Sequence, residues 1–167
     1  LSDSDGVVAV DLAGAEALFP TSDYEKLFAH ARAEGIPFTI HAGEAAGPES
    51  IRQAVDYGTA RIGHGVNCIH DKNLMNIIAE KGITLELCPT SNLNTKIVND
   101  IKDYPIDKII NNKIKVTINT DNMTVSGTDE ASEMKLICDT FGYDGNMRRI
   151  FVNNAIDAAF LSDEMKE

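Results

Sequence analysis

Short apolar runs alternate with helical patterns along this chain, and the alternation restricts the folds that it can adopt. The runs have the length of strands and occupy residues 6–12, 37–41, 60–65, 83–88 and 114–120. Several of them are apolar at consecutive positions, which is typical of strands buried on both faces of a parallel sheet. The sequence therefore predicts a series of βα units and an α/β fold.

Residues that are typical of helix ends support the same organisation. Ser22 and Glu25 have the spacing of a capping box, Pro48 suits the first turn of a helix, and Asp71 suits an N-cap. A glycine that can end a helix precedes three of the runs, at positions 35, 58 and 82. Two further helical patterns, at 129–142 and 146–160, follow the last run. No linker or low-complexity tract interrupts the sequence, so residues 1–167 are expected to belong to one domain.

Polar side chains gather where the predicted strands end. All five runs share this feature, at Asp11 to Gly14, His41 to Glu44, His64, Cys88 to Asn92 and Thr120 to Asn122. The carboxyl edge of the strands is where ligands bind in (β/α) barrels and in doubly wound sheets. A functional site is therefore expected at this edge.

Each of these residues also has a purely structural interpretation. His41 alone could be a core histidine bonded to a carbonyl, and Glu44 could cap the helix that begins near Pro48. Asp121 and Asn122 could form a turn. The presence of His64 on the same edge as His41 and Asp121 weakens these interpretations. His30 and His70 are expected in surface or loop positions, and Cys68 with His70 is half of a zinc pattern that has no second half.

Composition excludes several classes of partner. The net charge is −11 with no cluster of Lys and Arg, which disfavours nucleic acids and anionic membrane surfaces. No apolar run reaches the length of a membrane span. The three cysteines form neither an even set nor a CxxC pair, so reduced thiols and a cytoplasmic location are expected. The chain begins at Leu1 and not at methionine, so we expect it to be a fragment.

Two histidines, an aspartate and a glutamate on one edge suit a particular chemistry. Imidazole nitrogen and carboxylate oxygen are ligands of Zn²⁺, and a zinc site with an open position activates water near neutral pH. A nearby glutamate can donate a proton to a substrate nitrogen while the neighbouring carbon is attacked. This combination favours hydrolytic deamination of a heteroaromatic ring.

The motifs at the strand ends resemble those of the adenosine deaminase family, in the metal-dependent amidohydrolase superfamily. They are DLAG at 11–14, HAGE at 41–44, RIGHG at 61–65, CPTSN at 88–92 and INTDN at 118–122. The resemblance implies a (β/α)₈ TIM barrel of which this chain supplies strands four to eight and the C-terminal helices. Strands one to three are missing, so the barrel domain is incomplete and the N-terminal part of the same barrel is an expected partner.

The resemblance also implies roles for individual residues. His41 and Asp121 are expected to bind Zn²⁺, His64 to orient the attacking water as an electrostatic or basic partner, and Glu44 to protonate the purine N1. Gly14 is expected to offer its backbone N–H to the purine ring.

Further residues and the substrate follow from the same resemblance. Ser91 and Asn92 are expected to support the site. Asn122 stands where the family usually has a second aspartate, and we expect its amide to donate to the purine N7. The family draws two more zinc ligands from an HxH motif, which this sequence does not contain. The expected reaction is conversion of adenosine and deoxyadenosine to inosine-type products and ammonia. The alternatives are a deaminase of adenine or another purine, or an inactive half-barrel.

Other enzyme classes fit the residues less well. A barrel glycosidase could pair Glu44 with Glu86 or Asp121, but the chain has no Trp. Ser91 could act as a nucleophile with His64 as its base, but no GxSxG motif is present. The other type of zinc deaminase uses HxE and PCxxC motifs, and neither occurs here.

Overall fold

The core of the protein is a five-stranded parallel sheet whose strands follow one another in chain order. The fold is described from a computed structural model that covers residues 6–166. The strands are β1 (Val10–Leu12), β2 (Phe38–Ala42), β3 (Arg61–His64), β4 (Thr84–Leu87) and β5 (Lys115–Ile118). Each predicted apolar run therefore contains a strand, which confirms the βα organisation.

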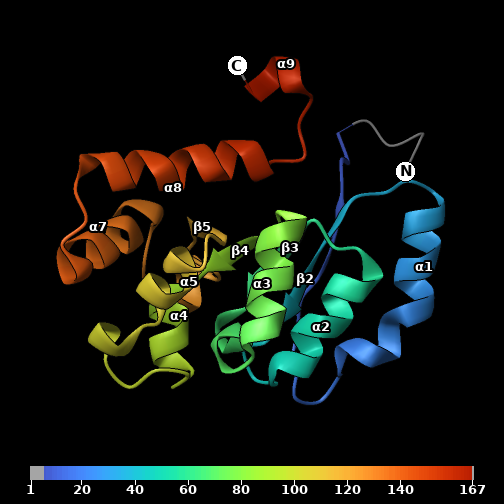
Figure 1. The fold of residues 1–167 in the computed structure, drawn as a ribbon, viewed down its shortest axis with the longest axis horizontal. Coiled ribbons are helices and arrows are strands. Elements are labelled where there is room, and N and C mark those ends of the chain that lie inside the picture. The colour runs from blue at the N-terminus through green and yellow to red at the C-terminus, as the bar shows by residue number, and fades with distance from the viewer. Residues whose placement is uncertain (1–5, 167) are drawn as a thin grey trace.

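Helices connect the strands and follow the last one. In chain order they are the 3₁₀ helix η1 (Thr21–Tyr24), α1 (Glu25–Ala33), α2 (Pro48–Tyr57), η2 (Val66–His70), α3 (Lys72–Lys81), α4 (Pro89–Asn94), η3 (Ile101–Asp103), α5 (Ile106–Asn111), α6 (Met123–Ser126), α7 (Glu130–Phe141), α8 (Gly145–Ala158) and α9 (Asp163–Lys166). In Figure 1, α1, α2 and α3 lie on the same side of the strands. A doubly wound sheet reverses its strand order and has helices on both faces, whereas sequential strands covered on one face form an arc of a barrel. The predicted barrel arc is confirmed.

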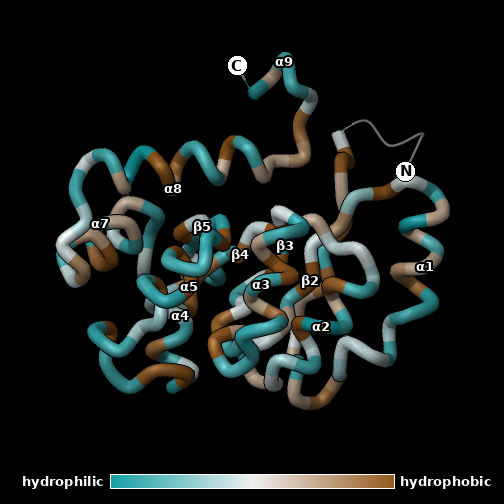
Figure 2. The backbone as a smooth tube through the Cα atoms, in the orientation of Figure 1, coloured by the Kyte–Doolittle hydropathy of each residue, from teal (hydrophilic) through white to brown (hydrophobic). Residues whose placement is uncertain are grey.

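One face of the sheet is apolar and packs against the helices. Its central row of paired residues runs from Ile40 through Ile62 and Leu85 to Val116, each at most 1% exposed. Helix residues close this layer, among them Phe28, Ile51, Leu74, Ile78 and Ile109. Figure 2 shows the contrast between the hydrophobic strands and helices such as α8, on which hydrophobic and hydrophilic residues alternate.

The opposite face is polar, because side chains alternate between faces along a strand. His41, Gly63, Glu86 and Thr117 form one row of strand partners on this face. Arg61 forms an ion pair with Glu86 at 2.9 Å, and the other carboxylate oxygen of Glu86 accepts a hydrogen bond from a threonine of β2, Thr39, at 2.9 Å. The concave face of the arc therefore carries hydrogen-bonding side chains that lead up to the strand ends.

Helix ends follow the predictions with one exception. The N-cap Asp71 accepts a hydrogen bond from the Leu74 N–H at 2.9 Å, and Pro48 opens α2. Gly58 and Gly82 adopt the left-handed conformation at the ends of α2 and α3. The predicted capping box of Ser22 is wrong, because the chain turns through η1 and α1 begins with no side-chain cap.

Three other features bear on the predictions from the sequence. The strand predicted at 6–12 is shorter than expected, because Val7 and Val8 are about half exposed and lie outside β1. Cys68, Cys88 and Cys138 are free and buried, as expected for reduced thiols. Within residues 6–166, no helix combines the length and the apolar character that crossing a membrane requires.

Both outer strands of the arc have an unpaired edge among the described residues, since β1 pairs only with β2 and β5 only with β4. Unpaired parallel edges are templates for association. We therefore expect the polypeptide of residues 1–167 alone to form oligomers or aggregates. Size-exclusion chromatography with light scattering tests this, and a stable monomer would contradict it.

Candidate active site

Three potential metal ligands meet at the carboxyl edge of the sheet. One ligand atom each from His41, His64 and Asp121 lie within 4.8 Å of one another. The imidazole centroids of His41 and His64 are 5.1 Å apart. His41 is on β2, His64 ends β3, and Asp121 follows β5. The expectation that these residues converge at one edge is confirmed.

The backbone is strained at two of these positions. His64 has φ +61° and Asp121 has φ +55°, in the left-handed region that non-glycine residues rarely adopt. Such conformations cost of order 1–3 kcal/mol each and cluster at functional sites. The left-handed backbone at His64 and Asp121 is thus consistent with a functional role of both residues.

The ring of His41 lies against Gly63 on the neighbouring strand. A Cβ atom on Gly63 would be 2.8 Å from Nδ1 of His41 and 3.0 Å from its Cγ, so only glycine leaves room for the imidazole. Nδ1 is buried and has no hydrogen-bond partner among the described residues, and Oδ1 of Asp11 lies 3.5 Å away. The Asp11 carboxylate raises the pKa of His41, against the opposing effect of burial. A carboxylate beside one ring nitrogen of a histidine fits a metal site, because metal-binding histidines commonly direct their other ring nitrogen at such a group.

Asp121 is oriented by a serine of α4. The Ser91 hydroxyl donates to Oδ2 of Asp121 at 2.7 Å. Hydrogen bonds from neighbouring side chains commonly orient ligating carboxylates. Ser91 is itself buried, so the carboxylate is held from the protein side.

A single amide connects the other two polar groups of the site. The buried hydroxyl of Tyr104 donates to Oδ1 of Asn92 at 2.9 Å, which turns the Asn92 Nδ2 group toward the site. This nitrogen lies 3.1 Å from Nδ1 of His64 and 3.2 Å from Oε1 of Glu44. Nδ1 of His64 is therefore the acceptor, and a neutral His64 carries its proton on Nε2. Burial lowers the pKa of His64, which favours this neutral form.

Glu44 projects into the site and does not cap a helix. The N-cap of α2 is Gly47, which has no side-chain cap, so the helix-cap interpretation of Glu44 is wrong. Oε1 of Glu44 accepts from Asn92 and from the hydroxyl of Thr95 at 3.2 Å. Oε2 lies 3.5 Å from Nε2 of His64. One carboxylate oxygen is thus anchored and the other faces the histidine.

Asn122 does shape the turn after Asp121, as its structural interpretation proposed. Its Oδ1 accepts from the Val125 N–H at 3.0 Å and caps α6. The amide nitrogen of the same side chain makes no hydrogen bond to the described residues. The cap therefore fixes the amide plane and leaves Nδ2 as a donor.

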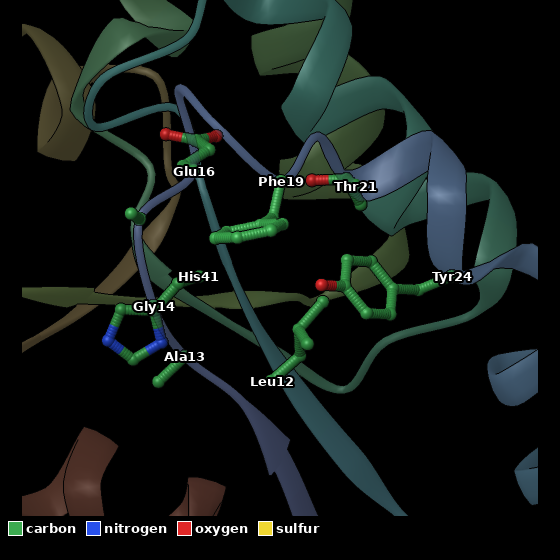
Figure 3. Close-up of a pocket in the computed structure, with 9 residues that line it drawn as sticks. Leu12, Ala13, Gly14, Glu16, Phe19, Thr21, Tyr24 and His41 are labelled. Carbon is green, nitrogen blue, oxygen red and sulfur yellow. The ribbon is translucent and has the colours of Figure 1, made fainter.

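A pocket lies beside His41, one of the potential metal ligands, between the end of β1 and β2. Its lining includes Gly14, Phe19, Tyr24 and His41, shown in Figure 3. Gly14 has φ +150° and open space where a Cβ would be, so a ligand can approach its backbone closely. Phe19 is 59% exposed and offers an aromatic face to the pocket.

The structure disfavours the roles that the rival enzyme classes would give to Glu86 and Ser91. Both carboxylate oxygens of Glu86 are engaged, by Arg61 and Thr39, so Glu86 is not a free acid or base. The Ser91 hydroxyl donates to Asp121 and not to His64, so these two residues do not form a nucleophile and base pair. His30 and His70 are exposed, as predicted.

Four residues with contacts at the site were missed by the sequence analysis. The first is Thr95, which contacts Glu44 from the C-cap of α4, a few residues beyond the CPTSN motif. Tyr104 lies outside the sequence motifs, and the sequence alone does not distinguish it from an ordinary aromatic residue of the core. Asn67 lies in η2, where its Nδ2 donates to the carbonyls of Glu44 and Ala46 at 3.0 and 2.8 Å. Glu16 follows the DLAG motif by two residues, and its position in that loop was the only signal available.

Comparison with known proteins places these motifs in one family. The family model described as adenosine deaminase matches residues 2–167. An adenosine deaminase of Haemophilus ducreyi is 47% identical over 162 residues, which are 97% of this chain and 47% of that protein. The chain thus spans about half the length of the curated relatives that it matches.

Solved structures resemble this fold over a similar share of their length. An adenine deaminase from Arthrobacter aurescens has a TM-score of 0.91 and 25% identity, covering 96% of this chain and 49% of that one. An amidohydrolase from Burkholderia ambifaria with bound Zn has a TM-score of 0.90 and 25% identity, covering 98% of this chain and 46% of its own.

The contact between Gly63 and His41 yields a prediction about metal binding. Gly63→Ala should displace the His41 ring and weaken Zn²⁺ binding by about tenfold or more, because substitutions of residues that orient a metal ligand commonly have effects of this size. A chelator competition titration measures the affinity. Gly145→Ala is the matched control, because nothing lies within 4 Å of a Cβ there. Equal affinity of both variants and the unmodified protein would contradict the prediction.

Proposed function

Because this chain belongs to the adenosine deaminase family, we propose that it forms the C-terminal five βα units of a zinc-dependent barrel that deaminates adenosine and deoxyadenosine. The observation that carries this proposal is the convergence of His41, His64 and Asp121 next to the anchored carboxylate of Glu44. In the proposed reaction, water replaces the exocyclic amino group of the purine and ammonia is released.

His41 and Asp121 are the proposed metal ligands in this chain. Their nitrogen and oxygen donors suit Zn²⁺, and the Asp11 carboxylate beside Nδ1 of His41 agrees with an imidazole that is oriented for metal binding. A bound zinc ion would lower the pKa of a water molecule and so make a nucleophile available near neutral pH. The remaining ligands are proposed to come from the missing barrel strands, because no HxH motif occurs in this sequence.

Glu44 is the proposed proton donor to the purine N1. Asn92 holds Oε1, and the Thr95 hydroxyl, whose one proton can go to Oε1 or to the Ser91 carbonyl, lies 3.2 Å from the same oxygen. This leaves Oε2 as the oxygen that carries the proton to the substrate. Protonation of N1 makes the adjacent carbon more electrophilic and stabilises the transition state.

His64 is proposed to orient the attacking water through Nε2–H. Its Nδ1 accepts from Asn92, so Nε2 is the protonated nitrogen of the neutral ring. The hydrogen-bond pattern thus favours the orienting role of His64 over the role of a base. The ring is 1% exposed, which keeps its orientation fixed.

Gly14 and Asn122 are the proposed contacts of the purine ring. Gly14 lines the pocket beside His41 and exposes its backbone. Asn122 follows the metal ligand Asp121 and keeps a free amide donor for N7. Adenine is the second candidate substrate, because the fold neighbour from Arthrobacter aurescens is named an adenine deaminase. Comparing kcat/KM for adenosine and adenine separates the two.

The role of Glu44 is tested with the complete barrel protein that we propose. Glu44→Gln should retain zinc and lower kcat on adenosine by on the order of 10²-fold or more, because it removes general acid catalysis. His41→Ala should instead lose zinc, which elemental analysis detects. Residues 1–167 alone should be inactive. Full turnover by the Glu44→Gln variant would disprove the role of Glu44, and an inactive zinc-loaded wild type would disprove the proposed reaction.

Asn122 generates a prediction about the purine N7. A 7-deaza analogue of adenosine should lose roughly 1–3 kcal/mol in kcat/KM, the cost of leaving the amide unpaired. Asn122→Asp keeps a cap oxygen for Val125 but presents a second oxygen to N7, so its activity should fall as rising pH ionises the carboxyl. If neither change alters kcat/KM across pH, Asn122 only shapes the turn.

A further inference from the structure

The loop that carries Glu44 is held by a second carboxylate that none of the proposed chemical steps uses. Glu16 lies in the loop after β1 and is only 9% exposed. Its Oε1 accepts from the Gly43 N–H at 2.6 Å. Its Oε2 accepts from the N–H groups of Glu44, Ala45 and Ala46 at 3.1, 2.8 and 3.0 Å. Four consecutive amides thus point at one side chain.

A hydroxyl pair completes the coordination of Glu16. The Ser50 hydroxyl donates to Oε1, and the Thr21 hydroxyl lies 2.8 Å from that of Ser50. Because the single proton of Ser50 goes to Glu16, Thr21 is the donor of the second bond. Burial raises the pKa of Glu16, but the hydrogen bonds from Ser50 and the backbone amides together lower it by more. The pKa of Glu16 therefore lies below its ordinary value. These bonds favour the carboxylate anion.

The carbonyls of the same loop are held from the other side. Asn67 Nδ2 donates to the carbonyls of Glu44 and Ala46, and the Asn67 N–H donates to the carbonyl of Gly43 at 3.1 Å. Gly43 has φ +72°, and a Cβ there would be 2.2 Å from the side chain of Ile51. The loop backbone is therefore hydrogen-bonded on both sides, through its N–H groups to Glu16 and through its carbonyls to Asn67. These bonds restrict the movement of the backbone that carries Glu44.

We propose that Glu16 is a positioning residue, whose carboxylate fixes the backbone of Gly43–Ala46 so that the Glu44 carboxyl reaches the purine N1. The inference rests on the proposed function. A loop without a fixed backbone would let the Glu44 carboxyl move away from the substrate, and misplacement of a catalytic group by about 1 Å can cost on the order of 10²-fold in rate. Glutamine cannot replace Glu16, because its one oxygen serves a single set of amides and its NH₂ group opposes the other.

The proposal is tested with the zinc-loaded complete barrel protein. Glu16→Gln should lower kcat on adenosine by on the order of tenfold or more, change KM by less than about threefold and leave the zinc content unchanged. Glu49→Gln is the matched control, because it removes the same charge from an exposed position in the first turn of α2 and should leave kcat unchanged.

A double-mutant cycle separates positioning from a general effect on the fold. If Glu16 acts through Glu44, adding Glu16→Gln to Glu44→Gln should slow the enzyme by less than about twofold more. The proposal would be overturned if the loss of kcat in the double variant were the product of the two single losses. An unchanged kcat in Glu16→Gln would overturn it as well. If Glu16→Gln does not fold, Ser50→Ala weakens the same cluster more mildly, and it should show a smaller loss that also vanishes in the Glu44→Gln background.

Hydrogen exchange gives a readout that does not depend on activity. The amides of Gly43–Ala46 should exchange faster in Glu16→Gln than in the unmodified protein, and Glu49→Gln should leave them unchanged. Equal protection in Glu16→Gln would show that Glu16 does not hold the loop. An inactive wild type with normal protection of these amides would instead disprove only the proposed reaction.

Discussion

The parallel register of the sheet is the constraint on which the candidate site depends. It aligns His41 with Gly63 and Glu86 in one row, so the proposed metal ligand, the glycine against which its ring lies and the ion pair with Arg61 share the concave face. A slip of one residue would turn His41 toward the helices and bring Ile40 to the concave face. Such a slip is costly, because the buried β2 residues Phe38, Ile40 and Ala42 would leave the apolar face that packs against the helices. Core packing therefore fixes the position of the chemistry.

Hydrogen-bonded loops continue this control beyond the strand ends. Tyr104 orients Asn92, and Asn92 in turn holds Glu44 and His64. Ser91, which precedes Asn92 in the chain, donates a hydrogen bond to Asp121. A short helix with two adjacent polar residues thus positions three groups of the proposed reaction. The left-handed backbone at His64 and Asp121 persists because these surrounding bonds and the packing of the strands determine it.

The sequence predicted the arrangement well where periodicity and strand ends carry the information. Apolar runs identified all five strands, and the polar residues that follow them identified the ligand cluster. It failed where the signal depends on tertiary contacts. The capping pattern of Ser22 was overridden by a 3₁₀ turn. Glu16, Asn67 and Tyr104 act through contacts with distant segments, and no local pattern distinguishes such residues from ordinary loop or core residues.

The central claim is that His41 and Asp121 bind the metal on which the reaction depends. Anomalous diffraction at the zinc absorption edge, from crystals of the zinc-loaded complete protein, tests this claim most directly. We expect one strong peak about 2.0–2.2 Å from a ring nitrogen of His41 and from a carboxylate oxygen of Asp121, on the side of the site that Glu44 faces. A fully occupied peak elsewhere, such as beside Cys68 and His70, with none between His41 and Asp121, would contradict it.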